Sequence, residues 1–585
     1  MRQKNHTPLI SIFISFLLFT TLSLYVVRNF FSGQKLQLSP STIKSLQHNN
    51  LIKEEVEEDS HRLVRNNPPL VKYVQPESVL LPDWEVLFVS SPDSILSKDN
   101  EYTCVFQNNE TSPGEYTGFL QSSNRTVFKC EVPDSVRCIR PLLKPILTKS
   151  DENITFSNGS NAVEMIRWSF LAYESLSTEN DVILFAKGIN NRQGVNRSPE
   201  ELLCVFDNGV GYSVKTSVVT SAQEVFRCNH PTETELGSLF KDGDEKIKIS
   251  LEIVGIRPVR VPSVAYYVPK SSIEDGEGKA QLCACTMVYN VAKFLKEWVI
   301  YNSKLGVEKF ILYDNDSDDD LHKVVQGLVD GEEYNVKVFF WPWPKAQEAG
   351  FSHSAIYAKE SCKWMMYMDV DEFVFAHSWL NESEPSQGMI PSFLPTTPLS
   401  SSPAPAPSPN TNLSDEKAKW LAQPIGQVSI KCLDYGPSNQ QSHPIAGVTQ
   451  GYTCRRRNEQ RHKSIVLLDT IDTSLQNAIH HFRLKEGWRG NTLSLHKGVV
   501  HHFKYQAWSE FKAKFRRRVS TYVVDWTQEA NLKSKDRTPG LGLEAIEPEG
   551  WAQQFCEVND TRLKRTTQRW FSQDSAIGSK LVWQD

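Results

Sequence analysis

The segment Asp369-Val370-Asp371 has the residue types and the spacing of a divalent-cation site. It follows a run of large apolar residues at 364–368, which predicts a buried strand. Side chains two residues apart along a strand point to the same side, so both carboxylates should face one site. Carboxylate oxygens suit a hard divalent cation, and such a cation can clamp a diphosphate and neutralise its charge. The alternative is a solvated acidic turn.

Alternating strand and helix patterns surround these aspartates and predict a mainly parallel α/β sheet. Ligands of such sheets bind at the carboxyl ends of the strands, so the aspartates fall at the edge where a ligand is expected. The expected strands are 282–290, 309–314, 336–341 and 364–369, and the expected helices are 293–305, 319–329 and 354–363.

Residues 76–270 precede this sheet and predict an all-β module. Short β-type runs are separated there by clusters of Gly, Pro, Asn and Ser. The module partly repeats itself, because the sequence around Cys104 and Cys130 resembles that around Cys204 and Cys228. The repeat predicts two related β units, each closed by one disulfide, with coincidence between two strand pairs as the alternative.

The chain has 11 cysteines, so at least one has no partner within the chain. A loop of 21 residues separates Cys432 from Cys454, which could form a further disulfide. A leftover cysteine such as Cys138 could link two chains in a homodimer.

The N-terminal residues predict a membrane anchor. Residues 8–27 carry no charge, and twenty helical residues span about 30 Å, the thickness of a hydrocarbon core. We therefore expect a cytosolic tail at 1–7, a transmembrane signal anchor at 8–28 and a stem at 29–75. The alternative is a cleaved signal peptide. Several Asn-x-Ser/Thr sequons agree with a luminal location of the remaining chain.

Charge and composition exclude some classes of partner and define the chain's last segments. Lys+Arg is 64 and Asp+Glu is 69, for a net charge of −5, which argues against a nucleic-acid-binding protein. Residues 384–411 are rich in Pro and Ser and predict an exposed loop inserted into the α/β domain. Residues 531–585 are expected to form a C-terminal tail.

Segments within residues 280–530 resemble glycosyltransferase family 92, which includes plant pectic β-1,4-galactan synthases. The resemblance implies a catalytic α/β domain of the GT-A type, a Rossmann-like mixed sheet. The fold expected for the whole chain is this domain preceded by the all-β module and one N-terminal transmembrane helix. The matching segments are Phe294-Leu-Lys-Glu-Trp298, Trp341-Pro-Trp-Pro344, Cys362-Lys-Trp-Met-Met-Tyr-Met-Asp-Val-Asp-Glu-Phe373, Tyr435-Gly-Pro-Ser438, Arg461-His-Lys-Ser-Ile-Val466, His480-His-Phe482 and Val500-His-His-Phe-Lys-Tyr505.

The resemblance also implies a metal and a nucleotide-sugar site. Asp369 and Asp371 would hold a divalent metal, Mn²⁺, against the diphosphate of a UDP-sugar, with His502 as a further ligand and His501 as its rival. Residues expected to contact the donor besides Asp369 are Asn290, Asp314 and Lys463. The alternatives are turn or cap roles for the first two and a solvated charged loop for Lys463.

The implied reaction is an inverting transfer of galactose from UDP-galactose to a cell-wall glycan, pectic galactan, in the Golgi. A general base would deprotonate the acceptor hydroxyl. The candidates are His481, Asp434 and Glu486, and the sequence does not choose among them. The alternative function is a non-catalytic glycan-binding or scaffolding membrane protein with a degenerate α/β domain.

Overall fold

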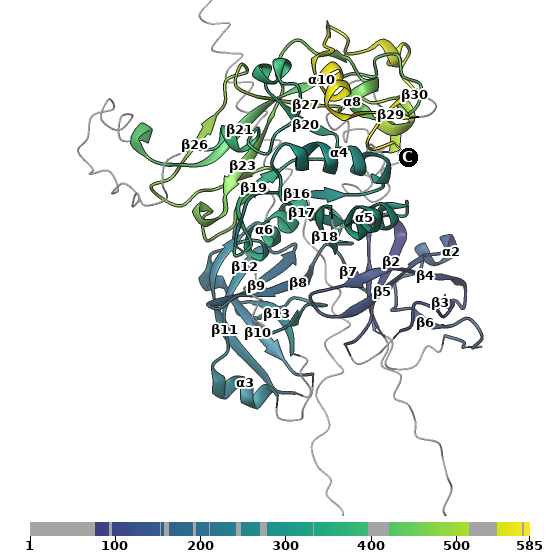
Figure 1. Cartoon of the computed structure of the whole chain (residues 1–585). Helices are drawn as coiled ribbons and strands as arrows, with labels where there is room; N and C mark the ends of the chain where they lie inside the picture. Colours follow the sequence, from purple (N-terminus) through teal and green to yellow (C-terminus); the bar gives the residue numbers. More distant parts are fainter. Residues whose placement is uncertain are drawn as a thin grey trace, which may run out of the picture. The chain divides into compact units, whose positions relative to one another are not determined.

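The computed structural model describes residues 76–584, except 93–95, 153, 157–162, 191–194, 210, 241–246, 270–277, 332, 396–419, 514–546 and 576–577. The predicted cytosolic tail, anchor and stem at 1–75 lie outside the described residues. Within the described part of the chain, no helix has the length and apolar character needed to cross a membrane. Figure 1 shows the described elements, from the purple N-terminal strands to the yellow C-terminal ones.

The first β sheet has the strand order β6-β3-β4-β5-β2-β1-β7. Within it, Cys104 of β3 forms a disulfide with Cys130 of β5. Its strands are β1 (Glu77–Leu80), β2 (Glu85–Val89), β3 (Tyr102–Val105), β4 (Thr111–Leu120), β5 (Arg125–Glu131), β6 (Ile146–Lys149) and β7 (Ile166–Arg167), with a short helix α2 (Asp134–Arg137).

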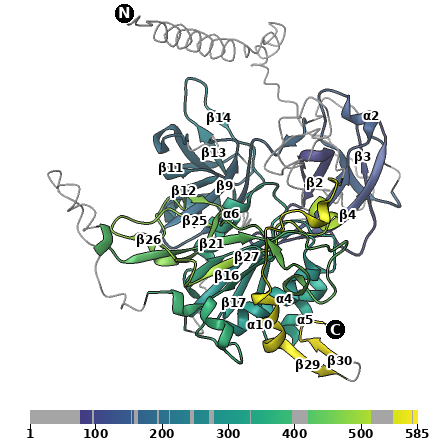
Figure 2. The ribbon, with the colours of Figure 1, turned by 90° about the horizontal axis from the view of Figure 1, so that it is seen from above.

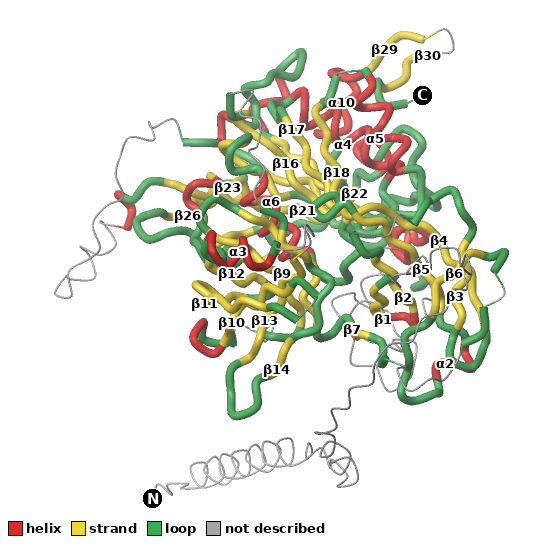
Figure 3. Tube along the Cα trace, turned by 90° about the horizontal axis from the view of Figure 1, so that it is seen from below, coloured by secondary structure: helices red, strands yellow, loops and turns green. Residues whose placement is uncertain are grey.

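The second β sheet has the strand order β13-β10-β11-β12-β9-β8, with β14 beside β13. This order repeats that of β6-β3-β4-β5-β2-β1 in the first sheet, because each strand number is higher by seven. A disulfide joins Cys204 of β10 to Cys228 of β12, so the predicted repeat and both of its disulfides are confirmed. Strands dominate this whole region in Figure 3. The elements are β8 (Leu171–Ser177), β9 (Asp181–Lys187), β10 (Leu202–Asp207), β11 (Ser213–Ala222), β12 (Val225–Asn229), α3 (Glu233–Leu239), β13 (Ile247–Ile253), β14 (Val259–Arg260) and β15 (Tyr266–Tyr267).

The α/β domain begins with alternating strands and helices, as the sequence predicts. Strands β17, β16 and β19 lie side by side and parallel, with β18 outside β17. The elements are β16 (Ala280–Val288), α4 (Ala292–Lys304), β17 (Lys309–Asp314), α5 (Leu321–Asp330), β18 (Asn335–Phe340), α6 (Gln347–Tyr357) and β19 (Cys362–Tyr367). The third helix begins at Gln347, seven residues before its predicted start. It ends at Tyr357 and cannot reach its predicted last residue, Lys363, because Cys362 and Lys363 belong to β19.

Both antiparallel and parallel pairings complete this mixed sheet: β23 pairs antiparallel with β19 and β21, and β27 pairs parallel with β21 and antiparallel with β20. Its full order is β18-β17-β16-β19-β23-β21-β27-β20, with β26 beside β21. The later strands are β20 (Glu372–Phe375), β21 (Ile425–Asp434), β22 (Cys454–Arg455), β23 (His462–Leu467), β24 (Asn477–Ala478), β25 (His481–Phe482), β26 (Arg489–Thr492) and β27 (Val499–His502).

The residues at 547–584 extend the α/β domain beyond the predicted boundary at 530. Helix α10 (Arg562–Phe571) follows β28 (Val558–Asn559) and precedes the hairpin of β29 (Ser572–Ser575) and β30 (Gly578–Leu581). Phe571 packs against Tyr301 of α4, and the two helices lie near each other in Figure 2. The predicted C-terminal tail therefore contributes to the core, since Leu563, Phe571, Leu581 and Trp583 are buried there.

Two further predictions are corrected by packing. The predicted Cys432–Cys454 disulfide is wrong, because Cys454 is bonded to Cys556, and Cys432 is a buried thiol in β21. The predicted exposed loop at 384–411 is packed over its first part, since Met389 and Ile390 are buried and Ile390 N donates to Leu305 O. The segment 396–411 lies outside the described residues.

The central sheet is buried on both faces. Leu282 and Ala284 of β16 face a core that includes α4 and α5, whereas Cys283 and Cys285 face a core that includes α6 and residues of both N-terminal sheets. Strand alternation explains this division, because neighbouring side chains point to opposite faces. The β module thus covers one face of the α/β sheet instead of standing apart from it.

Candidate functional site

The Asp369–Asp371 segment crosses the carboxyl edge of the sheet from β19 to β20. It follows β19 directly, and Glu372 begins β20 opposite His502, the last residue of β27. Asp434, the last residue of β21, also pairs with His502. Three strand ends therefore bring carboxylates and an imidazole together at one edge, as the rule for ligand sites in such sheets predicts.

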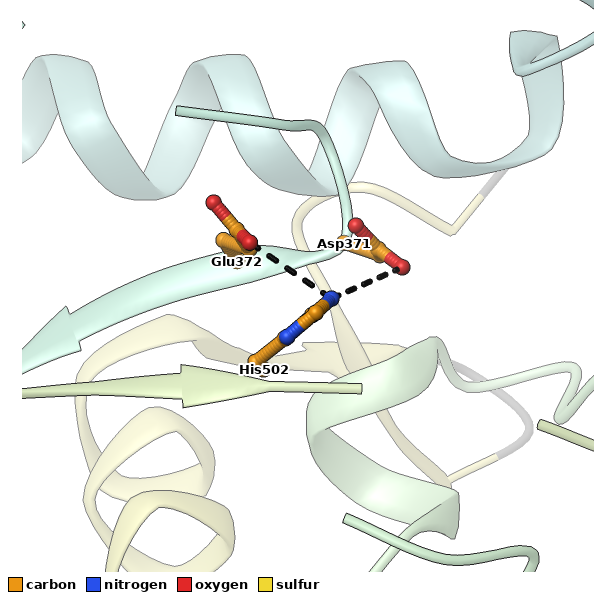
Figure 4. Close-up of side chains that lie close together, drawn as sticks. All are labelled: Asp371, Glu372 and His502. Atoms are coloured by element: carbon orange, nitrogen blue, oxygen red, sulfur yellow. Dashed lines mark ion pairs between the residues drawn. The ribbon is translucent and has the colours of Figure 1, made fainter. Parts of the chain in front are cut away.

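Asp371, Glu372 and His502 form a compact group whose ligand atoms all lie within 4.8 Å of one another. The His502 Nε2 atom is 3.9 Å from Asp371 Oδ2 and 3.5 Å from Glu372 Oε1, as Figure 4 shows. Glu372 is fully buried, and burial raises the pKa of its carboxyl, which Lys463 opposes. The sequence singled out Asp371 and His502, and the structure adds Glu372 to them.

Asp434 fixes the orientation of His502 from behind. Its Oδ1 is 3.1 Å from His502 Nδ1, and its Oδ2 is 3.3 Å from Lys504 Nζ. Burial works to raise the pKa of Asp434, but the contacts with His502 and Lys504 hold it below its usual range. A carboxylate that binds one imidazole nitrogen leaves the other nitrogen directed at a metal. Asp434, predicted as a candidate base, therefore has a positioning role here.

Lys463 lies beneath the Asp369–Asp371 segment and contacts three acceptors. Its Nζ is 2.9 Å from Asp369 Oδ2, 2.7 Å from Glu372 Oε1 and 2.5 Å from His480 Nε2. Burial opposes its charge, but Asp369 and Glu372 raise its pKa, so it remains an ammonium. The contacts with Asp369 Oδ2 and His480 Nε2 are hydrogen bonds, and the contact with Glu372 Oε1 is an ion pair. Lys463 therefore acts on the site as an internal counter-ion of its carboxylates.

The carboxylates of the site are suitable ligands for a divalent cation. In the described part of the chain, Lys463 forms ion pairs with Asp369 and Glu372, and Lys504 forms one with Asp434. Ligand atoms of Asp371, Glu372 and His502 lie within 4.8 Å of one another. Oxygen ligands together with one imidazole are a donor set that suits Mn²⁺ and similar divalent ions. The residues present therefore fit the expected metal.

His501 and His502 have opposite roles because successive strand residues face opposite sides. His501 is fully buried, and its Nδ1 lies 2.8 Å from the hydroxyl oxygen of Tyr435. Burial lowers the pKa of His501 to about 3. Of the two histidines that the sequence proposed as metal ligand, only His502 faces the carboxylates.

Two side chains of α4 hold β20 in place. Trp298 Nε1 donates to Glu372 O at 3.1 Å, and the Tyr301 hydroxyl donates to Val374 O at 2.6 Å. Strand β20 is the last strand of the sheet order, so these contacts satisfy carbonyls that no strand pairs with on that side. The helix therefore positions the start of β20, where Glu372 lies.

Asn290 and Asp314 lie together beside a second strand end on the same edge. The pairing of Val288 with Asp314, and of Cys285 with Tyr367, puts Asp314 and the segment after β19 at one level of the sheet. Asp314 is 1% exposed and accepts from Ser317 N at 3.0 Å. Asn290 Oδ1 accepts from Asp318 N at 2.9 Å. Both side chains thus shape the loop that follows β17.

The other two candidate bases occupy different surroundings. His481 Nε2 is 2.5 Å from His462 Nδ1, and burial, with the nearby His462, lowers the pKa of His481 to about 4. Glu486 is exposed and lies near Arg489, which pairs with Ile425 at the start of β21. At about 3.3 Å per residue, β21 separates that end from Asp434 by about 30 Å. The structure does not bring Glu486 to the cluster.

A cavity of about 540 Å³ lies elsewhere, lined by residues of both N-terminal sheets. Its charged groups pair with one another: Lys248 Nζ is 2.8 Å from Glu77 Oε1, and Arg260 Nη1 is 2.7 Å from Asp207 Oδ2. The carboxylate cluster has convergent ligand atoms from two carboxylates and an imidazole, a grouping that the described residues lining this cavity do not form. We therefore take the cluster as the candidate site.

Comparisons with known proteins show the family of the chain. The model of the family described as glycosyltransferase family 92 matches residues 279–396 and 404–537. A family 92 protein of Arabidopsis thaliana is 40% identical over 428 residues, which are 71% of this chain and 69% of that protein. A relative from Ricinus communis is 35% identical over 83% of this chain and 84% of its own length. One from Oryza sativa subsp. japonica is 34% identical over 85% and 80%.

Solved structures give a weaker likeness. The complex of S. aureus TarS with UDP-GlcNAc is 12% identical, covers 28% of this chain and 37% of that chain, and has a TM-score of 0.16. Glucosyl-3-phosphoglycerate synthase from Mycobacterium tuberculosis, in complex with Mn²⁺ and UDP, is 12% identical, covers 35% and 64%, and has a TM-score of 0.17. Scores of this size carry no argument about fold or ligand.

Proposed function

The chain belongs to glycosyltransferase family 92 and is therefore a glycosyltransferase, and from this premise we propose that it transfers galactose from UDP-galactose to a glycan. The observation that carries the proposal is the convergence of Asp371, Glu372 and His502 at the carboxyl edge of the sheet. A domain without activity would not need the contact of Asp434 with His502 or the contact of Lys463 with Asp369. We assign the α/β domain to the GT-A type on the same grounds.

We propose Mn²⁺ as the cation of the site. Asp371, Glu372 and His502 would hold it, and Asp434 would keep His502 Nε2 directed at it. Bound there, the ion would supply positive charge to the diphosphate of the departing UDP. Asp369, held by Lys463 and 31% exposed, would face the donor beside the metal.

The reaction we propose inverts the anomeric centre. The acceptor hydroxyl oxygen forms a bond to the anomeric carbon as the bond from that carbon to the UDP oxygen breaks. The hydroxyl proton leaves for a base, and UDP carries away the negative charge. The loop that follows β17, shaped by Asn290 and Asp314, would bind the nucleoside at the same edge of the sheet.

We further propose that the protein is a single-pass type II protein of the Golgi membrane, with its catalytic domain in the lumen. The uncharged stretch at residues 8–27 and the sequons of the later chain support this placement. A cell-wall glycan, pectic galactan, is the proposed acceptor, and the exposed thiol of Cys138 would allow a homodimer.

The test is UDP release by the purified full chain from UDP-galactose, with Mn²⁺ or with EDTA. We expect release with Mn²⁺ only, and a loss of about a hundredfold or more in Asp371→Asn. Asp469→Asn is the matched control, because Asp469 is exposed and far along β23 from the site, next to Lys359. Release from another UDP-sugar would correct the donor. The absence of UDP release and of Mn²⁺-dependent UDP binding would favour the glycan-binding alternative.

A further inference from the structure

The two N-terminal sheets meet the α/β domain through equivalent hairpin turns. Gln121 directly follows β4, and Gln223 directly follows β11, the corresponding strand of the second sheet. Gln121 Nε2 donates to Val338 O at 3.3 Å, and its Oε1 accepts from Phe340 N at 3.2 Å. Gln223 makes the same pair of contacts with Asn477, at 2.6 and 3.0 Å. Each turn thus pairs with the backbone of an α/β strand.

The first hairpin also reaches the loop that follows β17. Lys129 of β5 has its Nζ 2.7 Å from Asp316 Oδ2 and 3.4 Å from Glu85 Oε1. The side chains of Lys129 and Asp316 are 24% and 19% exposed, so solvent screens this ion pair only in part. A residue of the β module therefore contacts a loop at the ligand-binding edge of the α/β sheet.

This loop, residues 314–319, is held by its own domain at several points. Asn315 Nδ2 donates to Trp341 O at 2.6 Å, and Asp319 Oδ2 accepts from Ala292 N at 2.8 Å. Asp316 has a φ of 69°, a left-handed conformation that is uncommon for a residue other than glycine. Its side chain extends away from these internal contacts toward Lys129. The ion pair thus holds the loop at the residue with the least favourable backbone.

Resting on the proposed function, we propose that Lys129 is a positioning residue for nucleotide binding. Its ammonium fixes Asp316, and Asp316 fixes the loop whose neighbours Asp314 and Asn290 border the nucleoside position. The β module is then a built-in support of the donor site. Loss of the ion pair frees the loop, so nucleotide affinity falls while the carboxylate cluster, which lies on other strands, keeps its metal affinity.

A charge-swap cycle in the full chain tests this inference. The variants are Lys129→Glu, Asp316→Lys and the double variant, and the readouts are the Kd of UDP and the Kd of Mn²⁺ by calorimetry. We expect each single change to weaken UDP binding about tenfold and the double variant to recover most of it. The Mn²⁺ affinity should change less than about threefold in all three. In turnover, KM for the donor should rise more than kcat falls.

The matched control is Lys215→Glu in the second sheet. Lys215 Nζ is 2.7 Å from Glu252 Oε1, and this ion pair lies on β11 and β13, apart from the α/β domain. It should leave UDP binding unchanged. Should Lys129→Glu fail to fold, Lys129→Met replaces it, because the methionine retains the apolar stem without adding a like charge beside Glu85.

The outcomes separate this inference from the proposed function. Unchanged UDP affinity in the single variants would overturn it, and so would additive losses in the double variant, because an ion pair requires coupling between the two positions. Failure of the unaltered chain to bind UDP with Mn²⁺ would instead reject the proposed function, and with it the basis of this inference.

Discussion

The two N-terminal sheets share a strand order, a disulfide position and a docking turn, yet they hold the α/β domain by different chemistry. The first sheet makes polar contacts through Gln121 and Lys129. The second sheet adds buried aromatic packing, since Tyr173 of β8 packs against Trp343 with ring centroids 5.1 Å apart. The internal repeat therefore explains the shared strand order and disulfide position. The individual side chains determine which part of the α/β domain each sheet contacts.

The two N-terminal sheets also contact different parts of the α/β domain. The first sheet contacts β18 and the loop at 314–319, where we place the nucleoside. The second contacts Asn477, three residues before His480, whose Nε2 is bonded to Lys463 in the carboxylate cluster. The two sheets thus border the candidate site from two sides, and each can be weakened separately.

The largest expected effect is on the aromatic contact of the second sheet. Trp343→Ala should lower the free energy of unfolding by about 3–5 kcal/mol, because Trp343 is fully buried between the sheet and the α/β domain. Guanidinium unfolding measures the change. Trp420→Ala is the control, since Trp420 is 49% exposed. A loss no larger than the control's would show that the second sheet is not anchored by aromatic packing.

The disulfides should contribute equally to the two sheets. Their sequence separations are 26 and 24 residues, so loss of either bond should cost about 3 kcal/mol on the loop-closure model. The variants are Cys104→Ser with Cys130→Ser, and Cys204→Ser with Cys228→Ser, compared by thermal unfolding. Costs that differ by more than about 1 kcal/mol would break the equivalence of the repeats.

Substitutions of Gln121 and Gln223, in the two turns that contact the α/β domain, should lower stability by smaller and similar amounts. Their effects on UDP binding should differ. Gln121→Ala and Gln223→Ala each remove two hydrogen bonds to a strand backbone, for about 1–3 kcal/mol. UDP binding should weaken in Gln121→Ala, because β18 lies beside the nucleoside loop, and less in Gln223→Ala. Calorimetry with UDP and Mn²⁺ checks this order, and the reverse order would contradict the assignment of sides.

The smallest effect concerns the junction between the sheets. Glu174 of β8 is buried and accepts from Ser122 in the turn after β4, and burial raises the pKa of its carboxyl. The folded protein then binds this proton more tightly than the unfolded chain does. Stability should therefore fall as the pH rises from the ordinary range of a glutamate through the raised pKa.

Glu174→Gln should remove that part of the pH dependence and keep the contact with Ser122. Urea unfolding of both proteins between about pH 5 and about pH 8 measures the two slopes. Parallel curves for the variant and the original chain would show that the Glu174 carboxyl does not titrate in this range.

The sequence by itself determined the local order of the chain. Alternating patterns predicted the strands and helices from β16 to β19, and the position after β19 put Asp369 and Asp371 at one edge of the sheet. The predicted strand parity of these two residues is wrong, because β19 ends at Tyr367 and the segment is a turn in which Glu372 N donates to Asp369 O. The compact group of possible metal ligands therefore contains Asp371 without Asp369. The internal repeat predicted both β units and their disulfides, and the motifs at residues 280–530 identified the family. Each of these features depends on residues close in sequence or on a pattern that recurs within it.

Only the tertiary structure decided which side chains meet. Lys463 proved to be a counter-ion of Asp369 and Glu372, Asp434 a support for His502, and Trp343 a contact of the β module. Cys454 bonds Cys556 instead of Cys432 for the same reason. These contacts join residues 68 to 175 positions apart, and they depend on strand order and register. The spacing of residues along the chain does not reveal the strand order, because packing of the whole domain determines which distant strands pair.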